Sequence, residues 1–350
     1  MPSNFLLPSG RSVMKVTAFS TKRYDQQFID AANGDGVHQF LYLEDRLTPA
    51  TAALAAGSEA VCAFVNDAIT AEVVATLANG GTRLIVLRCA GFNQVDLKAA
   101  EAHGISIRRV PAYSPYAVAE FAIGMILTLN RKYHRAFNRV REGNFGIDGL
   151  LGFDLHGRTV GIIGTGKIGI LTAKPLAAMG CRVIGADPSE NRQFREFGGE
   201  YVSRERLFAE ADIVSLHCPL TPESFHLINA TTLAQMKDGV MIINTSRGAL
   251  IDAPAVIEAL KSGKVGHLGV DVYEQESEVF YEDLSNEIIQ DDVLQRLITF
   301  PNVLVTSHQA YFTETALRNI SDTTIANLND FAAGRSSANE VRAEHAFGAR

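Results

Sequence analysis

The sequence predicts an α/β protein built from two doubly wound domains, each with a parallel sheet. Short β-branched and apolar runs alternate with helical stretches along the chain, which is the pattern of parallel strands with helices on both faces. The alternation falls into two series with a long helical stretch between them. At 350 residues the chain is long enough for two domains, each with its own core.

The first series contains five expected strands, and the second contains six. A helix from Thr313 to Ala333 and a polar tail follow them, and a loose extension of about thirteen residues precedes a first strand that begins near Met14. The expected strands are Lys15–Phe19, Gln39–Tyr42, Ala60–Phe64, Leu84–Cys89 and Ile105–Val110, then Thr159–Ile163, Arg182–Ala186, Ile213–Leu216, Val240–Asn244, Leu268–Val270 and Val303–Thr306.

The helix between the two series begins at Ser114-Pro115, an N-cap residue followed by proline at the first helical position. It carries more apolar residues than one solvated face allows, so they are either buried core or a subunit interface, and we favour an interface contribution. These residues are Val118, Phe121, Ala122, Met125, Ile126 and Leu129. Pro175 lies inside a later helical pattern, where we expect a kink or a short helix.

Bulk composition excludes several classes of protein. The net charge is -7, which argues against a nucleic-acid surface. No apolar run reaches membrane-spanning length, because the longest candidate, from Ala117 to Leu129, is interrupted by Glu120. The four cysteines have no CxxC pairing, which predicts a reducing cytoplasm without disulfides or a bound metal.

A glycine-rich fingerprint opens the second series, at Gly164-Thr165-Gly166-Lys167-Ile168-Gly169. The strand Thr159–Ile163 runs straight into it, a helix pattern follows, and Asp187 ends the next strand 18 positions beyond Gly169 (187 − 169). A tight turn without ligand is the alternative. The pattern predicts a dinucleotide pyrophosphate at the helix N-terminus, with contacts from Gly164, Gly166, Lys167, Ile168 and Gly169.

Asp187 predicts which dinucleotide binds. Its carboxylate suits the adenosine ribose hydroxyls and would repel a 2′-phosphate, and the following Pro188 and Ser189 offer no cation. We therefore expect NAD rather than NADP.

Three polar residues each lie just beyond a short apolar run that is typical of a buried parallel strand. They are Arg247 in Asn244-Thr245-Ser246-Arg247-Gly248, Glu276 in Asp271-Val272-Tyr273-Glu274-Gln275-Glu276, and His308 in Thr306-Ser307-His308. Arginine can grip a carboxylate and polarise a carbonyl, histidine can supply a proton, and a carboxylate can orient the imidazole. Together they suit hydride transfer to a small keto acid.

Each of these assignments has a competitor. Arg247 could be a surface residue at a strand end. Glu276 competes with Glu274 and Glu278, and the main rival of His308 is His217, in Leu216-His217-Cys218-Pro219.

On these motifs the chain resembles the D-2-hydroxyacid dehydrogenases, and most closely the fermentative D-lactate dehydrogenases, from about Met14 to Glu340. The spacings from Arg247 to Glu276 (29) and from Glu276 to His308 (32) match that family. The resemblance implies a flavodoxin-like substrate domain, residues 1–112 completed by 311–350, a Rossmann NAD-binding domain, residues 113–310, and an active-site cleft between them. It also implies a homodimer or higher homo-oligomer, with a contact in the helix region after Ser114.

The resemblance assigns further residues. Cys218, Pro219, Thr245 and Ser246 are expected to line the cofactor site, and Asp271 to lie near the nicotinamide, with packing or capping as the alternative. On the first domain, Ala90 and Gly91 in Cys89-Ala90-Gly91-Phe92-Asn93 are expected to offer amides to the substrate carboxylate, because Gly91 allows close backbone approach. Tyr113 is expected at the cleft, with hinge packing as the alternative.

The activity implied by the resemblance is the reversible reduction of pyruvate by NADH to D-lactate. His308 is the expected acid and base, Glu276 its partner, and Arg247 the residue that binds the keto acid. A larger 2-keto acid is the neighbouring alternative. An NAD-sensing binding protein on the same scaffold is an alternative of a different class.

Overall fold

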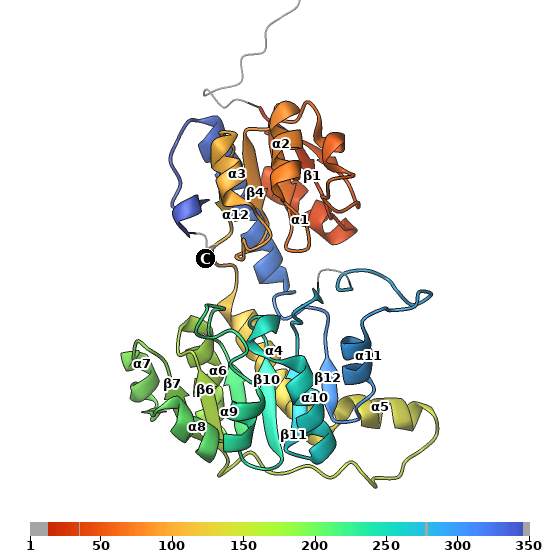
Figure 1. The fold of residues 1–350 in the computed structure, drawn as a ribbon, viewed down its shortest axis with the longest axis vertical. Helices are drawn as coiled ribbons and strands as arrows, with labels where there is room; N and C mark the ends of the chain where they lie inside the picture. The colour runs from red at the N-terminus through yellow and green to blue at the C-terminus, as the bar shows by residue number, and fades with distance from the viewer. Residues whose placement is uncertain (1–12, 35, 277–278, 346–350) are drawn as a thin grey trace, which may run out of the picture. The chain divides into compact units, whose positions relative to one another are not determined.

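The computed structural model describes residues 13–34, 36–276 and 279–345, and the chain divides into two compact units. The first unit comprises Met1–Ser114 and Phe312–Arg350, and the second comprises Pro115–Tyr311. Figure 1 shows the elements of both units. The extension expected ahead of Met14 lies, except for Val13, outside the described residues.

The first unit has a six-stranded sheet in the order β13-β5-β4-β3-β1-β2. Strands β1 to β5 are parallel, and their order 2-1-3-4-5 is the flavodoxin-like one that the family resemblance implied. The elements are β1 Lys15–Ala18, α1 Arg23–Asn33, β2 Gln39–Tyr42, η1 Ala52–Ala55, β3 Ala60–Ala63, α2 Ala71–Asn79, β4 Leu84–Leu87, α3 Leu97–Ala102, β5 Ser106–Arg109, α12 Glu314–Ala332, β13 Glu340–Val341 and η4 Ala343–His345.

The central strands β3 and β4 are buried on both faces of the sheet, which explains why they are continuous apolar runs. Along β4, Ile85 and Leu87 join a core with α2 and α3, whereas Leu84 and Val86 join a core with Ile29 of α1 and with α12. Thr313 caps α12 through a hydrogen bond from the amide of Ala316 (3.2 Å). The C-terminal helix was therefore predicted almost to the residue.

The prediction was wrong about the polar tail after that helix. Glu340 and Val341 form β13, which pairs antiparallel with β5 at the edge of the sheet. A two-residue strand has no periodicity that sequence reasoning could detect, and its partner lies more than 200 residues earlier.

The second unit has a seven-stranded sheet in the order β12-β11-β10-β9-β6-β7-β8, with every pair parallel. This is the Rossmann order with one further strand, and the two-residue β8 was not predicted. The elements are α4 Pro115–Arg131, α5 Tyr133–Arg141, β6 Thr159–Ile163, α6 Lys167–Ala178, β7 Arg182–Ala186, α7 Arg192–Glu196, β8 Glu200–Tyr201, α8 Arg204–Glu210, β9 Ile213–Leu216, α9 Ala230–Gln235, β10 Val240–Asn244, η2 Gly248–Leu250, α10 Ala253–Ser262, β11 Val265–Val270, α11 Asp292–Ile298 and β12 Val303–Val305.

Helix α4 packs inside its own unit, against α6 and against β10 and β11. Its apolar residues Ala122, Met125, Ile126 and Leu129 are buried in the core that also contains the inner side chains of β6 and α6, and Phe121 packs on that core. Burial in the core of this unit, the alternative to the interface contribution that we favoured, therefore accounts for the broad apolar stripe. The packing of α4 against α6, β10 and β11 buries these side chains without a second subunit.

Pro175 does not end helix α6, which continues for three more residues to Ala178. The proline lies in the last third of the helix, and the amide of Met179 still donates to its carbonyl oxygen (2.9 Å). The helix is 12 residues long, close to the ordinary length.

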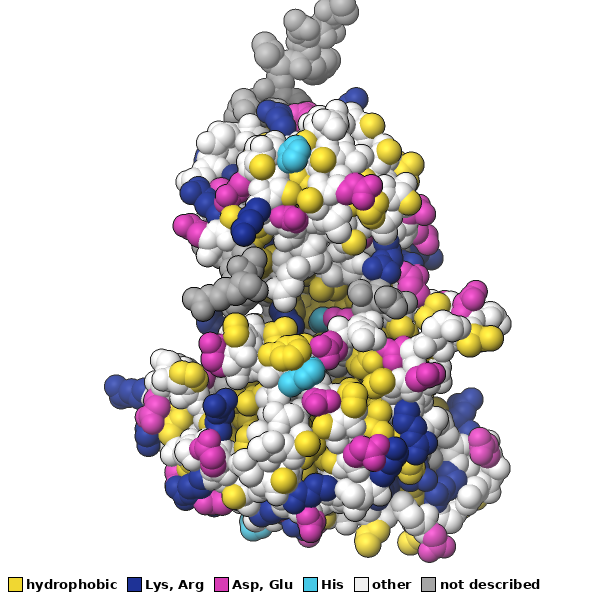
Figure 2. Space-filling view, viewed as in Figure 1, with side chains coloured by type: hydrophobic (Ala, Val, Ile, Leu, Met, Phe, Trp, Pro, Cys, Tyr) yellow, Lys and Arg dark blue, Asp and Glu magenta, His cyan; other side chains and the backbone are white. Residues whose placement is uncertain are grey.

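Charged side chains of both signs are interspersed over the face of each unit that Figure 2 shows. Among the described helices, none is both long enough and apolar enough to cross a membrane.

Candidate functional site

The second unit brings the predicted site residues to one edge of its sheet. Strands β6, β9, β10, β11 and β12 are parallel and in register, so the residues that follow them emerge at the same carboxyl edge. The residues that follow these strands are Gly164, His217 and Cys218, Thr245 to Arg247, Asp271, and Thr306 to His308.

The glycine fingerprint forms the turn that the sequence predicted. Gly164 has φ +92°, and a Cβ there would lie 2.6 Å from the carbonyl of His217. A Cβ on Gly169 would lie 2.0 Å from the carbonyl oxygen of Gly164. Gly166, by contrast, faces open space and precedes α6 without any side-chain cap. The start of α6, with exposed Lys167 and half-buried Ile168, therefore suits a bound pyrophosphate.

Asp187 follows β7 and holds the fingerprint turn directly. Its Oδ2 accepts a hydrogen bond from the amide of Thr165 (2.6 Å), and its Oδ1 accepts one from the amide of Ser189 (2.8 Å). Each oxygen can accept a further bond from a ribose hydroxyl. Sequence reasoning missed Tyr201, whose hydroxyl is 2.7 Å from Thr165 Oγ1 and accepts from the amide of Asn191 (2.7 Å).

The ends of β9 and β10 carry the residues expected to line the cofactor site. Thr245 Oγ1 is buried and has no hydrogen-bond partner among the described residues, so it is available to a polar ligand. Ser246 Oγ instead donates to the carbonyl of Leu216 (2.9 Å). Burial raises the pKa of the Cys218 thiol to about 11, so this half-buried side chain is neutral, and Pro219 is exposed.

Asn244 shapes the turn that carries Arg247. Its fully buried amide donates from Nδ2 to the carbonyl of Arg247 (2.8 Å) and accepts at Oδ1 from the amide of Ser246 (3.0 Å). The half-buried Arg247 side chain donates from Nη1 to the carbonyl of Ser246 (2.7 Å). The remaining guanidinium N–H groups can bind a carboxylate.

His308 and Glu276 form a close pair, with Nδ1 and Oε1 2.8 Å apart and each side chain about one-fifth exposed. The other carboxylate oxygen, Oε2, accepts from the amide of Tyr273 (2.9 Å). Because the pair occupies Nδ1, the ring nitrogen Nε2 is left for proton exchange with a ligand. Sequence reasoning missed Tyr281, whose hydroxyl donates to the His308 carbonyl (3.2 Å).

The rivals of these two residues make other contacts. Glu274 Oε2 lies 3.1 Å from Nε2 of His226, on the surface, and Glu278 lies outside the described residues. His217 pairs through Nε2 with Ser215 Oγ (2.9 Å), and burial lowers the pKa of its ring to about 4. It is Glu276, therefore, that contacts His308.

Asp271 caps the segment that carries His308. Its Oδ1 accepts from Thr306 Oγ1 (2.5 Å) and from the amide of Gln309 (2.9 Å), and its Oδ2 accepts from the amide of Ala310 (2.8 Å). Burial raises the pKa of this fully buried carboxyl group, and the three hydrogen bonds oppose that effect. The geometry matches the capping alternative, because both carboxylate oxygens hold the His308 segment.

The remaining predicted residues lie in the first unit. Ala90 and Gly91 follow β4 in a half-buried loop, and the carbonyl of Ala90 accepts from Arg109 Nη1 (2.6 Å). Tyr113 is half-buried, and its carbonyl accepts from Asn319 Nδ2 at the start of α12 (2.6 Å).

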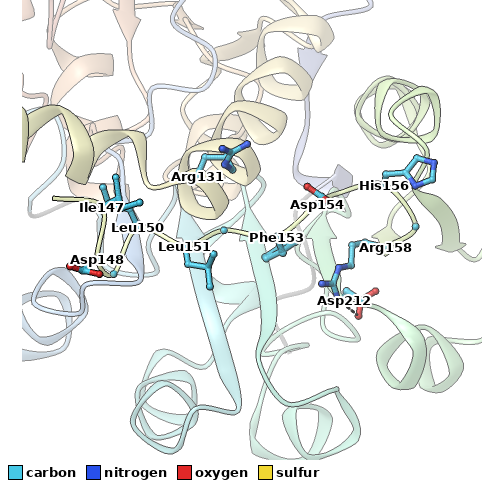
Figure 3. Close-up of a pocket in the computed structure, with 13 residues that line it drawn as sticks. Arg131, Ile147, Asp148, Leu150, Leu151, Phe153, Asp154, His156, Arg158 and Asp212 are labelled. Carbon is cyan, nitrogen blue, oxygen red and sulfur yellow. Dashed lines mark ion pairs between the residues drawn. The ribbon is translucent and has the colours of Figure 1, made fainter. Parts of the chain in front are cut away.

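A pocket in the second unit lies at the opposite edge of the sheet (Figure 3). Arg158 and Asp212, which directly precede β6 and β9, line it and form an ion pair at 4.0 Å. The rest of its wall is formed by Arg131, residues 147–154, His156 and Gly157. Since the predicted residues of this unit follow the strands, this pocket is not the candidate active site. The described residues contain no group of three or more His, Cys, Asp or Glu that could hold a metal ion.

Comparison with known proteins gives matches over most of the chain. The model of the D-isomer specific 2-hydroxyacid dehydrogenase NAD binding domain matches residues 123–310. D-lactate dehydrogenase of Escherichia coli is 51% identical over 328 residues, 94% of this chain and 100% of the relative. The apo-structure of D-lactate dehydrogenase from Escherichia coli matches with a TM-score of 0.86 at 49% identity, covering 94% of this chain and 100% of that one. A structure described as the pyruvate reductase of Chlamydomonas reinhardtii matches with a TM-score of 0.90 at 42% identity, covering 93% and 98%.

Proposed function

The chain belongs to the D-isomer specific 2-hydroxyacid dehydrogenase family and carries its NAD-binding domain, and from that premise we propose that it interconverts pyruvate and D-lactate. The observation that carries the proposal is the 2.8 Å contact between His308 and Glu276, at the same sheet edge as Arg247. An imidazole oriented for proton transfer favours an enzyme over a binding protein on the same scaffold, and turnover decides between the two.

His308 and Glu276 carry out the proton transfer. In the direction of reduction, the carbonyl carbon of the keto acid accepts a hydride, which the bound cofactor would supply, and His308 donates a proton from Nε2 to the carbonyl oxygen. Glu276 accepts the Nδ1–H bond, which fixes the ring orientation and stabilises the imidazolium. In the reverse direction the neutral imidazole removes the proton from the hydroxyl group.

Arg247 binds and polarises the keto acid. Its guanidinium offers a planar pair of donors, which suits the adjacent carboxylate and carbonyl oxygens of a 2-keto acid. The Asn244 hydrogen bonds hold the turn that presents it. We assign Ala90, Gly91 and Tyr113 of the first unit to substrate binding as well.

NAD, when bound, supplies or accepts the hydride. The fingerprint Gly164 to Gly169 would hold the pyrophosphate and Asp187 the adenosine ribose, and the unpartnered Thr245 Oγ1 supports a polar contact at the end of β10. Cys218, Pro219 and Ser246 would contact the cofactor through their backbone or apolar atoms. We assign Asp271 to the support of His308.

The test is NADH oxidation with pyruvate, oxaloacetate, hydroxypyruvate, phenylpyruvate and 2-ketoisocaproate side by side, with product chirality measured. We expect the highest kcat/KM with pyruvate, and D-lactate as product. His308→Gln should lose on the order of a hundredfold or more in kcat, the usual value of a general acid. A higher kcat/KM for a bulky keto acid would identify that keto acid, rather than pyruvate, as the preferred substrate. NAD binding without turnover of any keto acid would instead indicate a sensor.

We propose further that two copies of the chain associate through the arm, which we define as α5 with the segment that follows it, residues 133–151. None of the α5 side chains is buried, and the arm exposes Tyr133, Phe137, Phe145, Ile147 and Leu151 by more than half. Apolar residues gathered in this way on one segment are typical of a subunit contact. Part of the arm also lines the pocket of Figure 3.

Light scattering after size-exclusion chromatography tests the association. We expect the wild-type chain to be a dimer or larger, and Phe137→Glu to shift it toward the monomer. Leu54→Glu, at a comparably exposed apolar residue of the first unit, is the matched control and should leave the mass unchanged. A monomeric wild-type chain at micromolar concentration would contradict the proposal.

A further inference from the structure

We infer that Arg109 is a positioning residue for substrate binding, acting through the substrate loop, which we define as Cys89 to Phe92. The inference rests on the proposed function, because that function assigns the Ala90 and Gly91 amides of this loop to the substrate carboxylate. No sequence motif pointed to Arg109, which lies in β5, the strand next to β4.

One guanidinium contacts two parts of the loop. Arg109 Nη1 donates to the carbonyl of Ala90 (2.6 Å), and the guanidinium carbon lies 5.2 Å from the centre of the Phe92 ring. A hydrogen bond from a charged donor and a cation–π contact therefore grip the loop on either side of Gly91. Within the loop, Cys89 Sγ also donates to the Gly91 carbonyl (3.2 Å), but a thiol is a weak donor.

The bond to the Ala90 carbonyl decides where the Gly91 amide points. That carbonyl and the Gly91 N–H belong to one planar trans peptide group, so they point in opposite directions. With the carbonyl held by Arg109, the N–H is directed to the side away from the guanidinium. Glycine has little conformational preference of its own, so the loop needs such an external anchor.

Arg109 is itself held by the C-terminal segment. Its amide donates to the carbonyl of Asn339 (3.0 Å), and its carbonyl accepts from Asn327 Nδ2 of α12 (3.0 Å). Asn339 directly precedes β13, which pairs with β5. The two-residue strand that sequence reasoning missed thus supports the backbone of a residue that orients the substrate loop.

The adjacent Arg108 provides a matched control, since successive strand residues point to opposite faces of the sheet. It donates from Nη1 to the carbonyl of Asn327 (2.9 Å) and from Nη2 to that of Arg335 (2.7 Å), and it lies over the ring of Phe331. These contacts tie α12 to the sheet. Arg108 makes none of the loop contacts described for Arg109.

The experiment compares steady-state kinetics of the full-length wild type with Arg109→Gln, Arg109→Lys and Arg108→Gln, with pyruvate and NADH varied in turn. Thermal unfolding is measured for each protein. We expect Arg109→Gln to raise the KM for pyruvate on the order of tenfold, as befits a lost hydrogen bond from a charged donor. Its KM for NADH should be unchanged, because the fingerprint lies in the other unit. Arg109→Lys should recover most of the loss, since an ammonium group can still donate to the Ala90 carbonyl.

Arg108→Gln should lower the unfolding temperature and leave the KM for pyruvate unchanged. An unchanged KM in Arg109→Gln would overturn the inference, as would an equal rise in Arg108→Gln or an equal rise in the KM for NADH. If Arg109→Gln does not fold, Phe92→Leu removes the ring contact and must raise the KM for pyruvate. A wild type without keto-acid turnover would refute the proposed function itself, which is a separate outcome.

Discussion

Glu276→Gln tests the catalytic pair most directly. In the wild type both carboxylate oxygens accept hydrogen bonds, Oε1 from His308 Nδ1 and Oε2 from the Tyr273 amide. Glutamine has one acceptor oxygen and one NH₂ group, so it must turn a donor toward one of these two donors. It also removes the charge that stabilises the imidazolium.

The size of the effect follows from the geometry. A hydrogen bond involving an ionised group is worth about 1.5–3 kcal/mol, and this pair is only about one-fifth exposed. At about 1.4 kcal/mol for each factor of ten, we expect kcat for pyruvate reduction near pH 8 to fall roughly tenfold to 150-fold. At acid pH the loss of rate should be only partial, because the carboxylate charge matters least where protons are abundant.

The assay is kcat for NADH oxidation with pyruvate from pH 5 to pH 9. Glu274→Gln is the matched control, because Glu274 lies two residues away and pairs with His226 on the surface. It should follow the wild-type profile throughout. The reasoning is refuted if Glu274→Gln changes the pH profile and Glu276→Gln does not.

Three further variants probe the rest of the site. Asp271→Asn should lower the free energy of unfolding by about 1–3 kcal/mol in urea and should reduce kcat, because the NH₂ group of the new asparagine must face one of the three donors that Asp271 accepts from. An unchanged free energy of unfolding and an unchanged kcat would rule out the capping role. NADH should be preferred over NADPH at least roughly tenfold in kcat/KM, and Asp187→Ala should narrow that preference mainly by weakening NADH binding; equal use of both cofactors by the wild type would contradict this. Burial lowers the pKa of His217 to about 4 in the folded chain, whereas a histidine of the unfolded chain has the ordinary value of about 6.5. Between these two pH values the unfolded chain binds a proton that the folded chain does not. His217 therefore lowers the free energy of unfolding as pH falls from about 6.5 toward 4. In urea unfolding of the cofactor-free protein, His217→Gln should therefore lose less free energy of unfolding at acid pH than the wild type does. An identical loss in both proteins would exclude His217 as its cause.

The sequence by itself determined the strands and the edge of the sheet at which the site lies. Buried parallel strands are continuous apolar runs because both of their faces are covered, so β6, β7, β9 and β10 were predicted to the residue. Since the ends of parallel strands meet at one edge, the positions of Arg247 and His308 after their strands predicted that edge. The glycine fingerprint was also a local pattern, and the structure leaves no room for a Cβ at Gly164 or Gly169, whereas Gly166 faces open space.

Only the tertiary structure decided which side chains meet. Glu274 and Glu276 lie in one loop, and a choice between them depends on the direction each side chain takes, which no periodicity encodes. The capping role of Asp271 depends on amides more than 30 residues later in the chain, and the burial of α4 depends on its packing against α6. Arg109 and β13 show the same limit, because their contacts join segments more than 200 residues apart. Local patterns report the backbone conformation that a segment prefers, whereas these contacts exist only once distant segments have been brought together by folding.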